Sequence, residues 1–361
     1  MSDRVFNFGA GPCTLPREVL EEARDEFVDH HGAGMALFEM SHRSAAYLQI
    51  HEEALTATRE VFAVPDDFAV LFVQGGASLQ FAMVPMNLLA GSDSGGYAVT
   101  GHWAKRALAD AGHHGDVYAA WDGAADDYTR TPGPGEPAVR PGTRYLHITS
   151  NETIGGIRFP EWPDPGVPLV ADMSSDMMSR PIPWERFDLV YGGVQKNLGP
   201  PGMAIVFVRT SALERANRDL ASYLRYDVHA DNGSLYNTPP MFTVWIVGKV
   251  LAWMQARGGL AAMEEAAARR ADAVYAAIDG SEAFYRSPVD PGSRSMMNVV
   301  FRLPDEDLER QFLAGAGERG MVGLKGHRIV GGCRASLYNA MPLAGAEALA
   351  AYMGEFRGGH A

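Results

Sequence analysis

The sequence has few cysteines, no long uninterrupted apolar run and no excess of basic residues. Its two cysteines, Cys13 and Cys333, are too few for a disulfide framework or a cysteine zinc site, which favours a reduced, cytoplasmic protein. The longest apolar stretch, 242–254, contains Lys249 and is too short to span a bilayer. The formal net charge of -13 argues against binding to nucleic acid or to an anionic membrane. The N-terminal segment has no apolar signal-peptide core, and no internal repeat stands out.

The chain instead has the composition of a globular protein with sizeable cores, at 361 residues, 47% hydrophobic and 21% charged. Short apolar runs of strand length alternate with segments of helical pattern. The expected strands are 69–73, 97–100, 145–149, 167–171, 189–191 and 203–208, and the expected helices are 16–23, 44–62, 77–89 and 103–111. Such alternation predicts an α/β fold with a mostly parallel sheet covered by helices. Polar segments at 122–142 and 229–240 are expected to be loops.

A second, smaller α/β unit is expected towards the C-terminus. A helical stretch over 241–278, broken at Gly258 and Gly259, leads into it. Its own elements are a strand at 298–301, a helix at 305–319, a turn or strand at 328–331 and a helix at 343–356. We place a boundary near residue 255, which gives a large domain at 16–255 and a small domain made of 1–15 and 256–361.

Lys196 lies in a glycine-rich turn, GGVQKNLGP, between two apolar strands. Asp172 directly follows another apolar strand. Ligands in α/β sheets bind beyond the carboxyl ends of the strands, so the two side chains are expected to meet there. Taken singly, Lys196 reads as an ordinary solvated turn lysine, and Asp172 as a cap for the segment that follows it.

Together the lysine and the acid suit pyridoxal phosphate, which bonds a lysine amine and pairs its ring nitrogen with a carboxylate. The turn Gly75-Gly76-Ala77-Ser78, between a strand and a helix, offers backbone amides for the phosphate. Trp103 follows another strand and is placed to stack on the ring, although a tryptophan there also suits the core. The turn lacks the spacings of dinucleotide and nucleotide triphosphate sites.

The chain resembles the phosphoserine aminotransferases, which belong to the fold-type I, class V aminotransferases. The resemblance covers nearly the whole length. It is carried by the stretches FNFGAGPCTLP (6–16), MSHRS (40–44), QGGASLQFAMVPMNLL (74–89), SNETIGG (150–156), ADMSSDMMSRP (171–181), YGGVQKNLGPPG (191–202), DNGSLYNTPP (231–240) and LKGHRIVGGCRASLYNAMP (324–342). It implies a homodimer of two-domain chains that bind pyridoxal phosphate.

The resemblance implies roles residue by residue. Lys196 matches the Schiff-base lysine and Asp172 the partner of the ring nitrogen. The other implied cofactor contacts are Ala77, Ser78, Trp103, Thr153 and Gln195, with Asn237 and Thr238 reaching the cofactor phosphate of the other subunit. The implied binders of the substrate anion are His42, Arg43, His327, Arg328 and Arg334. Some members of the family have an arginine where this chain has Ser78, which removes a cation from the site.

The implied reaction is reversible amino-group transfer between L-glutamate and 3-phosphohydroxypyruvate, a step of serine biosynthesis. Both substrates carry a second anion, which suits the two cationic clusters at His42-Arg43 and 327–334. Related enzymes also accept the phosphorylated threonine-like intermediate of pyridoxine synthesis. Two alternatives remain: a cysteine desulfurase, which needs a reactive cysteine on a mobile loop, and a non-enzymatic binding module. No metal is implied.

Overall fold

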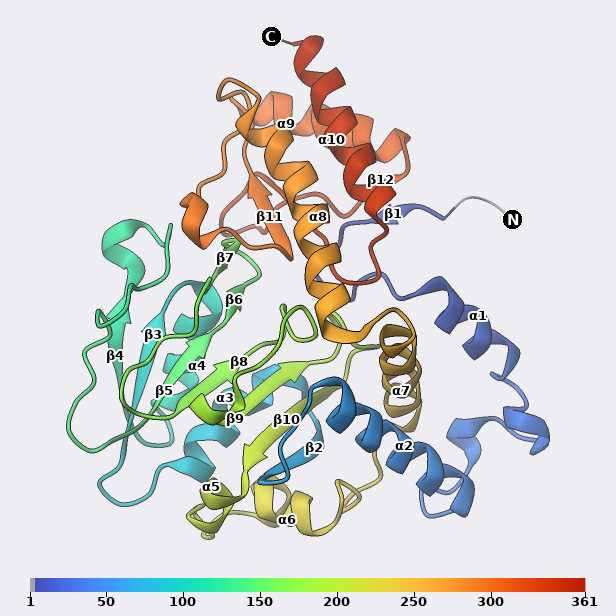
Figure 1. The fold of residues 1–361 in the computed structure, drawn as a ribbon, viewed down its shortest axis with the longest axis vertical. Coiled ribbons are helices and arrows are strands. Elements are labelled where there is room, and N and C mark those ends of the chain that lie inside the picture. Colours follow the sequence, from blue (N-terminus) through green and yellow to red (C-terminus); the bar gives the residue numbers. More distant parts are fainter. Residues whose placement is uncertain (1–3, 361) are drawn as a thin grey trace.

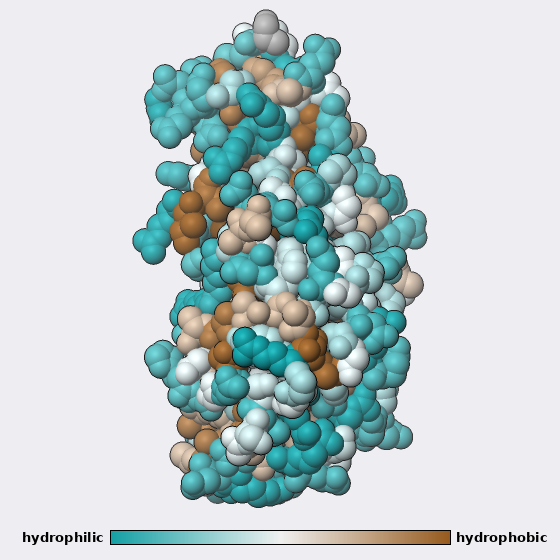
Figure 2. Space-filling view, turned by 90° about the vertical axis from the view of Figure 1, so that its left-hand side faces the viewer, coloured by the Kyte–Doolittle hydropathy of each residue, from teal (hydrophilic) through white to brown (hydrophobic). Residues whose placement is uncertain are grey.

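A computed structural model describes residues 4–360, which form a larger part around a seven-stranded sheet and a smaller part above it (Figure 1). The long helix α8 (Gly259–Asp279) leads from the larger part to the smaller one, where the chain ends with α10 (Leu343–Gly358). Hydrophilic side chains cover most of the face seen in Figure 2, and hydrophobic ones appear there in scattered groups. No helix of the described chain is both long and apolar enough to cross a membrane.

The central sheet has the strand order β2-β10-β9-β8-β5-β3-β4. Its strands are β2 (Phe68–Gln74), β3 (Ser94–Val99), β4 (Asp116–Asp122), β5 (Thr143–Thr149), β8 (Leu169–Asp172), β9 (Phe187–Gly193) and β10 (Met203–Arg209). Only β10 runs antiparallel to its neighbours β2 and β9; the other pairs among these strands are parallel. The expected mostly parallel α/β sheet is therefore confirmed.

Alternate side chains of the strands feed two separate cores, one on each face of the sheet. In β2, Phe72 packs into the first core, whereas Leu71 and Val73 pack into the other. In β10, Ile205 faces the first core and Val206 the second. Strands buried on both faces are continuously apolar, which is why they stand out in the sequence.

Helices cover both faces of the sheet. On the first face lie α2 (Ala45–Val61) and α7 (Met241–Gln255), which pack against each other. On the second lie α3 (Gly76–Leu88) and α4 (His102–Ala111), with α5 (Thr210–Glu214) and α6 (Tyr226–Asp231) beside them. Helix α1 (Arg17–Asp25) packs on α7. The short 3-10 helices are η1 (His30–Gly32), η2 (Leu37–Glu39), η3 (Gly123–Asp126), η4 (Trp184–Arg186), η5 (Ser222–Leu224) and η6 (Pro291–Ser293).

The smaller part has its own core, to which the N-terminal segment contributes Phe8. Strand β1 (Phe6–Asn7) pairs with β12 (Met321–Val322), and β11 (Asn298–Phe301) pairs with β13 (Cys333–Ser336). Helix α9 (Glu306–Glu318) begins at Asp305, whose side chain accepts a hydrogen bond from the Leu308 amide. Strands β6 (Asn151–Glu152) and β7 (Ile157–Arg158) pair with each other in a separate two-stranded antiparallel sheet.

The proposed division into 16–255 and 1–15 with 256–361 stays a prediction, and its residues 1–3 and 361 lie outside the described chain. Most expected elements are found within a few residues. Two expectations need correction: β3 starts earlier than 97, and the loop expected from 229 begins inside α6. Of the two alternatives for the segment 328–331, the structure has the turn. Strand β4 was not expected, because it is an edge strand with several exposed side chains.

The early start of β3 has a packing reason. A Cβ atom on Gly95 would lie 2.9 Å from Cζ of Tyr145, and one on Gly96 would lie 3.3 Å from the hydroxyl of Tyr118. The tyrosine rings of the neighbouring strands therefore occupy the space that side chains would take. Glycine is unusual in strands, so it hides this stretch from a search by pattern.

Candidate active site

The ends of β2, β8 and β9 meet at one pocket of about 320 Å³. They meet because β2, β8 and β9 run in the same direction, so their carboxyl ends lie at the same edge of the sheet. The loops after these strands carry the polar residues. The lining residues are Gly75, Gly76, Ala77, Ser78, Phe81, Trp103, Asp172, Ser174, Gln195, Lys196, Pro201 and Gly202. Six of the residues expected to contact the cofactor are among them: Ala77, Ser78, Trp103, Asp172, Gln195 and Lys196.

Lys196 is buried, and it follows β9 in the turn that leads to β10. Its Nζ donates a hydrogen bond of 2.6 Å to Oγ1 of Thr153, another residue of the expected cofactor set. Nζ also lies 5.5 Å from the centroid of the Trp103 ring. Burial lowers the pKa of Lys196, although the nearby carboxylates of Asp172 and Glu152 oppose that effect. The amine is thus nearer to its neutral, reactive form than a solvated lysine is.

Asp172 is the last residue of β8 and is 5% exposed. Its Oδ1 accepts a hydrogen bond of 2.8 Å from the Ser174 amide. Burial raises the pKa of Asp172, and the charge of Lys196 acts in the opposite direction. The side chain therefore caps the turn that follows the strand, and it also lines the pocket with Lys196.

The N-terminus of α3 also lines the pocket. Gly75 has a φ of 95°, the left-handed conformation that glycine adopts readily. A Cβ atom there would lie 2.7 Å from Cδ2 of Leu79, so a side chain would also clash. The first amides of a helix have no intrahelical acceptor, and the helix dipole makes this end positive. This wall therefore suits an anion such as a phosphate.

One side-chain donor among the residues that line the pocket has no hydrogen-bond partner. Nε1 of Trp103 is buried and finds no hydrogen-bond acceptor among residues 4–360. Such orphaned buried donors are rare in folded proteins and need an explanation. A bound molecule with an acceptor atom supplies one. The pocket thus combines a buried lysine, a buried carboxylate, a positive helix end and an aromatic ring, and these residues fit pyridoxal phosphate.

Glu152 is a buried residue next to the pocket that the sequence did not single out. It is 0% exposed, and its two carboxylate oxygens accept hydrogen bonds from the amides of Trp103 (3.0 Å) and Ala104 (2.8 Å) at the start of α4. Burial raises its pKa to about 7, and the two amides oppose the rise. It thereby holds Trp103 at the pocket wall. Its position beside Thr153, just after a predicted strand, was the available signal.

We expect Glu152→Gln to lower the stability by about 1–2 kcal/mol, because the amide retains only one acceptor oxygen for two backbone donors. The pH dependence has a definite sign. The folded-state pKa lies above the usual 4.5, so the native state holds the extra proton, and wild-type stability decreases as the pH rises from about 4.5 through about 7. Glu152→Gln has no ionisable group at this position, so its stability should not show this decrease with pH.

Thermal unfolding of both proteins at about pH 5 and about pH 8 measures the effect. The stability gap between wild type and Glu152→Gln should be larger at the lower pH. A gap that widens as the pH rises would show that the carboxylate is stabilised in its charged form.

Arg334 and His327 lie beside these residues. One Nη of Arg334 donates a hydrogen bond of 3.3 Å to the backbone carbonyl of Thr153. The side-chain hydroxyl of the same threonine accepts the hydrogen bond from Lys196. Burial lowers the pKa of Arg334. The pKa of His327 is also lowered, by burial first and then by the charges of Arg334 and His102. Arg328 is exposed. Arg334 therefore places a cationic side chain next to Thr153, the hydrogen-bond partner of Lys196.

Four other expected site residues do not line this pocket within a single chain. Asn237 and Thr238 are exposed, and Thr238 Oγ1 lies 3.5 Å from Nδ1 of His42. The backbone carbonyl of Thr238 accepts a hydrogen bond of 2.6 Å from Nε2 of Gln74. Arg43, next to His42, is exposed as well. The fold groups His42 with Thr238 at the surface, apart from the lining of the Lys196 pocket.

Neither cysteine has the features of a nucleophile. The thiol of Cys13 donates a hydrogen bond to the backbone carbonyl of Lys196, and burial raises its pKa to about 12. Cys333 lies in the core of the smaller part, where burial also raises its pKa. Reactive cysteines need a lowered pKa and access to solvent. These environments count against the desulfurase alternative.

Comparisons with known proteins agree with this chemistry. The family model described as "Aminotransferase class-V" matches residues 5–349. The phosphoserine aminotransferase of Lysinibacillus sphaericus is 47% identical over 361 residues, covering all of both chains. The solved phosphoserine aminotransferase of Bacillus circulans subsp. alkalophilus superposes with a TM-score of 0.97, at 47% identity and full coverage of both chains. The pyridoxal-phosphate-bound enzyme of Trichomonas vaginalis gives 0.93 at 35% identity, covering 97% of this chain and 100% of that one.

Proposed function

The chain belongs to the aminotransferase class-V family, among the phosphoserine aminotransferases, and on that premise we propose how its residues perform the reaction. It is a pyridoxal-phosphate-dependent aminotransferase. It transfers an amino group reversibly between L-glutamate and 3-phosphohydroxypyruvate, which gives O-phospho-L-serine and 2-oxoglutarate. The observation that carries the proposal is the buried group of Lys196, Thr153 and Asp172 at the ends of neighbouring strands.

Pyridoxal phosphate, when bound, supplies an aldehyde that bonds an amine and a ring that takes up the electrons of the broken C–H bond. We assign Ala77 and Ser78, at the positive end of α3, to its phosphate, and Trp103 to its ring. Asp172 provides the buried negative charge for a protonated ring nitrogen. Thr153 and Gln195 complete the contacts within the chain.

Lys196 performs the proton transfer. With the cofactor bound, its Nζ would take a proton from the α-carbon of the substrate, as general base, and would then donate it to the carbon that the aldehyde supplied, as general acid. Burial favours the neutral amine that the first step needs. The hydroxyl of Thr153 orients Nζ through their 2.6 Å hydrogen bond. The same lysine serves both half-reactions, so we expect ping-pong kinetics.

The cations near the pocket select substrates with a second anion. Arg334 adjoins Lys196 through Thr153, and His327 and Arg328 lie in the turn before it. A guanidinium binds both carboxylate and phosphate with two parallel hydrogen bonds, so one group can serve both glutamate and 3-phosphohydroxypyruvate. Each charge-assisted hydrogen bond contributes about 1.5–3 kcal/mol. We also assign His42 and Arg43 to this anion.

The test is an assay of purified protein with glutamate and 3-phosphohydroxypyruvate, with pyruvate and oxaloacetate as competing acceptors. We expect kcat/KM for the phosphorylated acceptor to exceed that for pyruvate by at least about 10²-fold. This factor corresponds to the binding free energy of two charge-assisted hydrogen bonds, which pyruvate cannot make. Equal use of pyruvate would reject the substrate assignment. The phosphorylated hydroxythreonine of pyridoxine synthesis should be included, because its distal phosphate offers the same anion to the same cations.

We propose that the protein is a homodimer in which Asn237 and Thr238 reach the cofactor phosphate of the partner subunit. Both residues are exposed in the single chain and are absent from the lining of its own pocket, which supports the proposal. We further propose a cytoplasmic location and a role in serine biosynthesis. The two free cysteines fit a reducing compartment.

Mixed dimers test the shared site. One chain carries Lys196→Ala, and the other carries Asn237→Ala with Thr238→Ala. If the sites are shared, each mixed dimer keeps one complete site, which has Lys196 from one chain and residues 237 and 238 from the other. Random reassortment of equal amounts should then restore about a quarter of wild-type activity, since half of the dimers are mixed. Activity that stays at the sum of the two parent proteins would place 237 and 238 at the pocket of their own chain.

A further inference from the structure

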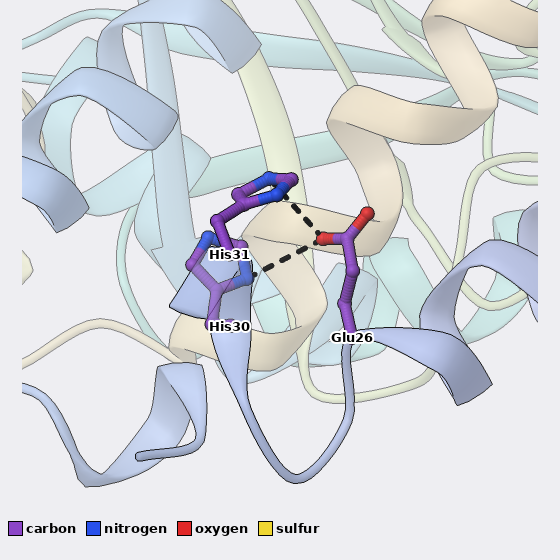
Figure 3. A group of neighbouring side chains, drawn as sticks. All are labelled: Glu26, His30 and His31. Carbon is purple, nitrogen blue, oxygen red and sulfur yellow. Dashed lines mark ion pairs between the residues drawn. The ribbon is translucent and has the colours of Figure 1, made fainter. Parts of the chain in front are cut away.

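Glu26, His30 and His31 bring three ligand atoms together between α1 and η1 (Figure 3). Oε2 of Glu26 lies 3.4 Å from Nδ1 of His30 and 3.4 Å from Nε2 of His31. All three atoms lie within 4.8 Å of one another. These residues are absent from the lining of the Lys196 pocket, and the aminotransferase reaction assigns them no role.

Two of the three ligand atoms are buried without a hydrogen-bond partner. His30 is 5% exposed, and neither its Nδ1 nor Oε2 of Glu26 makes a hydrogen bond to any residue of the described chain. Buried polar atoms nearly always have a hydrogen-bond partner. Two such atoms that face each other without one, Nδ1 of His30 and Oε2 of Glu26, indicate that a bound ion lies between them.

Two of the three ligand spacings match tetrahedral coordination. Zinc binds histidine nitrogen and carboxylate oxygen at about 2.0–2.1 Å, so adjacent ligands of a tetrahedral ion lie about 3.3–3.4 Å apart. Both distances from Oε2 of Glu26 have that value. His31 completes the set because its backbone is left-handed, with a φ of 52°, and its ring lies 4.4 Å from that of His30.

The neighbouring charges leave the carboxylate free to bind. Nζ of Lys249, in α7, lies 3.1 Å from Oε1 of Glu26 and 2.5 Å from Oε1 of Glu22. The lysine therefore takes the other oxygen of Glu26 and shares its charge with a second acid. His31 is 70% exposed, so an ion can enter from solvent. His30 and His31 also line a cavity of about 600 Å³.

We propose that Glu26, His30 and His31 bind one zinc ion, with the fourth coordination position open to water. Two nitrogens and one carboxylate suit zinc and exclude calcium and magnesium, which prefer all-oxygen sites. The ion would tie the end of α1 to η1, and through Lys249 this segment is held against α7. The alternative is a simple ion pair between Glu26 and one protonated histidine.

Titration of the holoenzyme with zinc in a phosphate-free, non-chelating buffer tests the proposal, with heat release as the readout. We expect one tight site per chain. His31→Asn removes a ligand at an exposed position and suits the left-handed backbone, and Glu26→Gln keeps the shape of the side chain. Each should weaken zinc binding at least about tenfold. His113 and His114 are both exposed, so the double variant His113→Ala/His114→Ala is the matched control and should bind like wild type.

Thermal unfolding gives a second readout that does not depend on activity. Zinc should raise the Tm of wild type and of the control by the same amount, and should raise the Tm of His31→Asn and Glu26→Gln much less. Without zinc, the Tm of His31→Asn reports whether that variant folds normally. Zinc binding of equal strength in all four proteins would overturn the proposal and reveal binding elsewhere. Absence of binding in wild type would leave the ion pair as the correct description.

Discussion

Lys196→Ala is expected to reduce kcat/KM for glutamate and 3-phosphohydroxypyruvate by about 10⁴-fold or more. General acid–base catalysis alone contributes about 10²–10⁴-fold, and the same amine also bonds the cofactor. The residue is buried, and it is the only lysine among those lining the pocket, so no other lysine there can substitute for it. The visible absorbance of the lysine-bound cofactor should disappear from the purified variant.

The chain has only four lysines, which makes a matched control simple. Lys105 lies in α4 with its Nζ 3.9 Å from the centroid of the Tyr128 ring, outside the pocket lining. Lys105→Ala should keep both its colour and near wild-type kcat/KM. A Lys196→Ala protein that turned over at more than about a hundredth of the wild-type rate would contradict the assignment of this lysine as the catalytic acid and base.

Asp172→Asn is expected to reduce kcat about 10²- to 10³-fold. Asparagine keeps an acceptor for the Ser174 amide but loses the buried negative charge that we assign to the ring nitrogen of the cofactor, and removing one member of such a buried pair costs about 3–5 kcal/mol. The loss should appear mainly in kcat, because the charge acts when electrons move into the ring. Steady-state kinetics with both substrates measure this division.

Asp188 provides the control for Asp172. It is also buried, but it pairs with Arg209 and Arg215 at the other end of the sheet. Asp188→Asn should lower the Tm while it leaves kcat of the folded enzyme nearly unchanged. If Asp172→Asn kept wild-type kcat, the carboxylate would be a turn cap alone. Asp172→Glu restores the charge and should recover part of the activity.

Most of the fold could be predicted because its strands are buried on both faces. The apolar runs that became β2, β5, β8, β9 and β10 are visible in the sequence for that reason. The elements that were missed lack such a signal. Strand β4 lies at the sheet edge, β3 begins with glycines covered by tyrosine rings, and β1 has two residues whose partner strand is far away in the chain.

The sequence by itself determined the chemistry of the pocket. Lys196 and Asp172 each follow a strand, and parallel strands end at one edge of a sheet, so their meeting could be inferred before the fold was known. Glu152 could not be found in this way. Its carboxylate accepts hydrogen bonds from two backbone amides of α4, and that contact joins segments that are far apart in the sequence.

Only the tertiary structure decided the remainder. It paired Thr153 with Lys196, and it left Trp103 Nε1 without a partner. It also turned His31 toward His30 and Glu26 through a left-handed backbone conformation. Periodicity and strand ends are local features, which the order of residues fixes. Burial, orphaned atoms and side-chain distances arise when separate segments pack, and no stretch of sequence contains them alone.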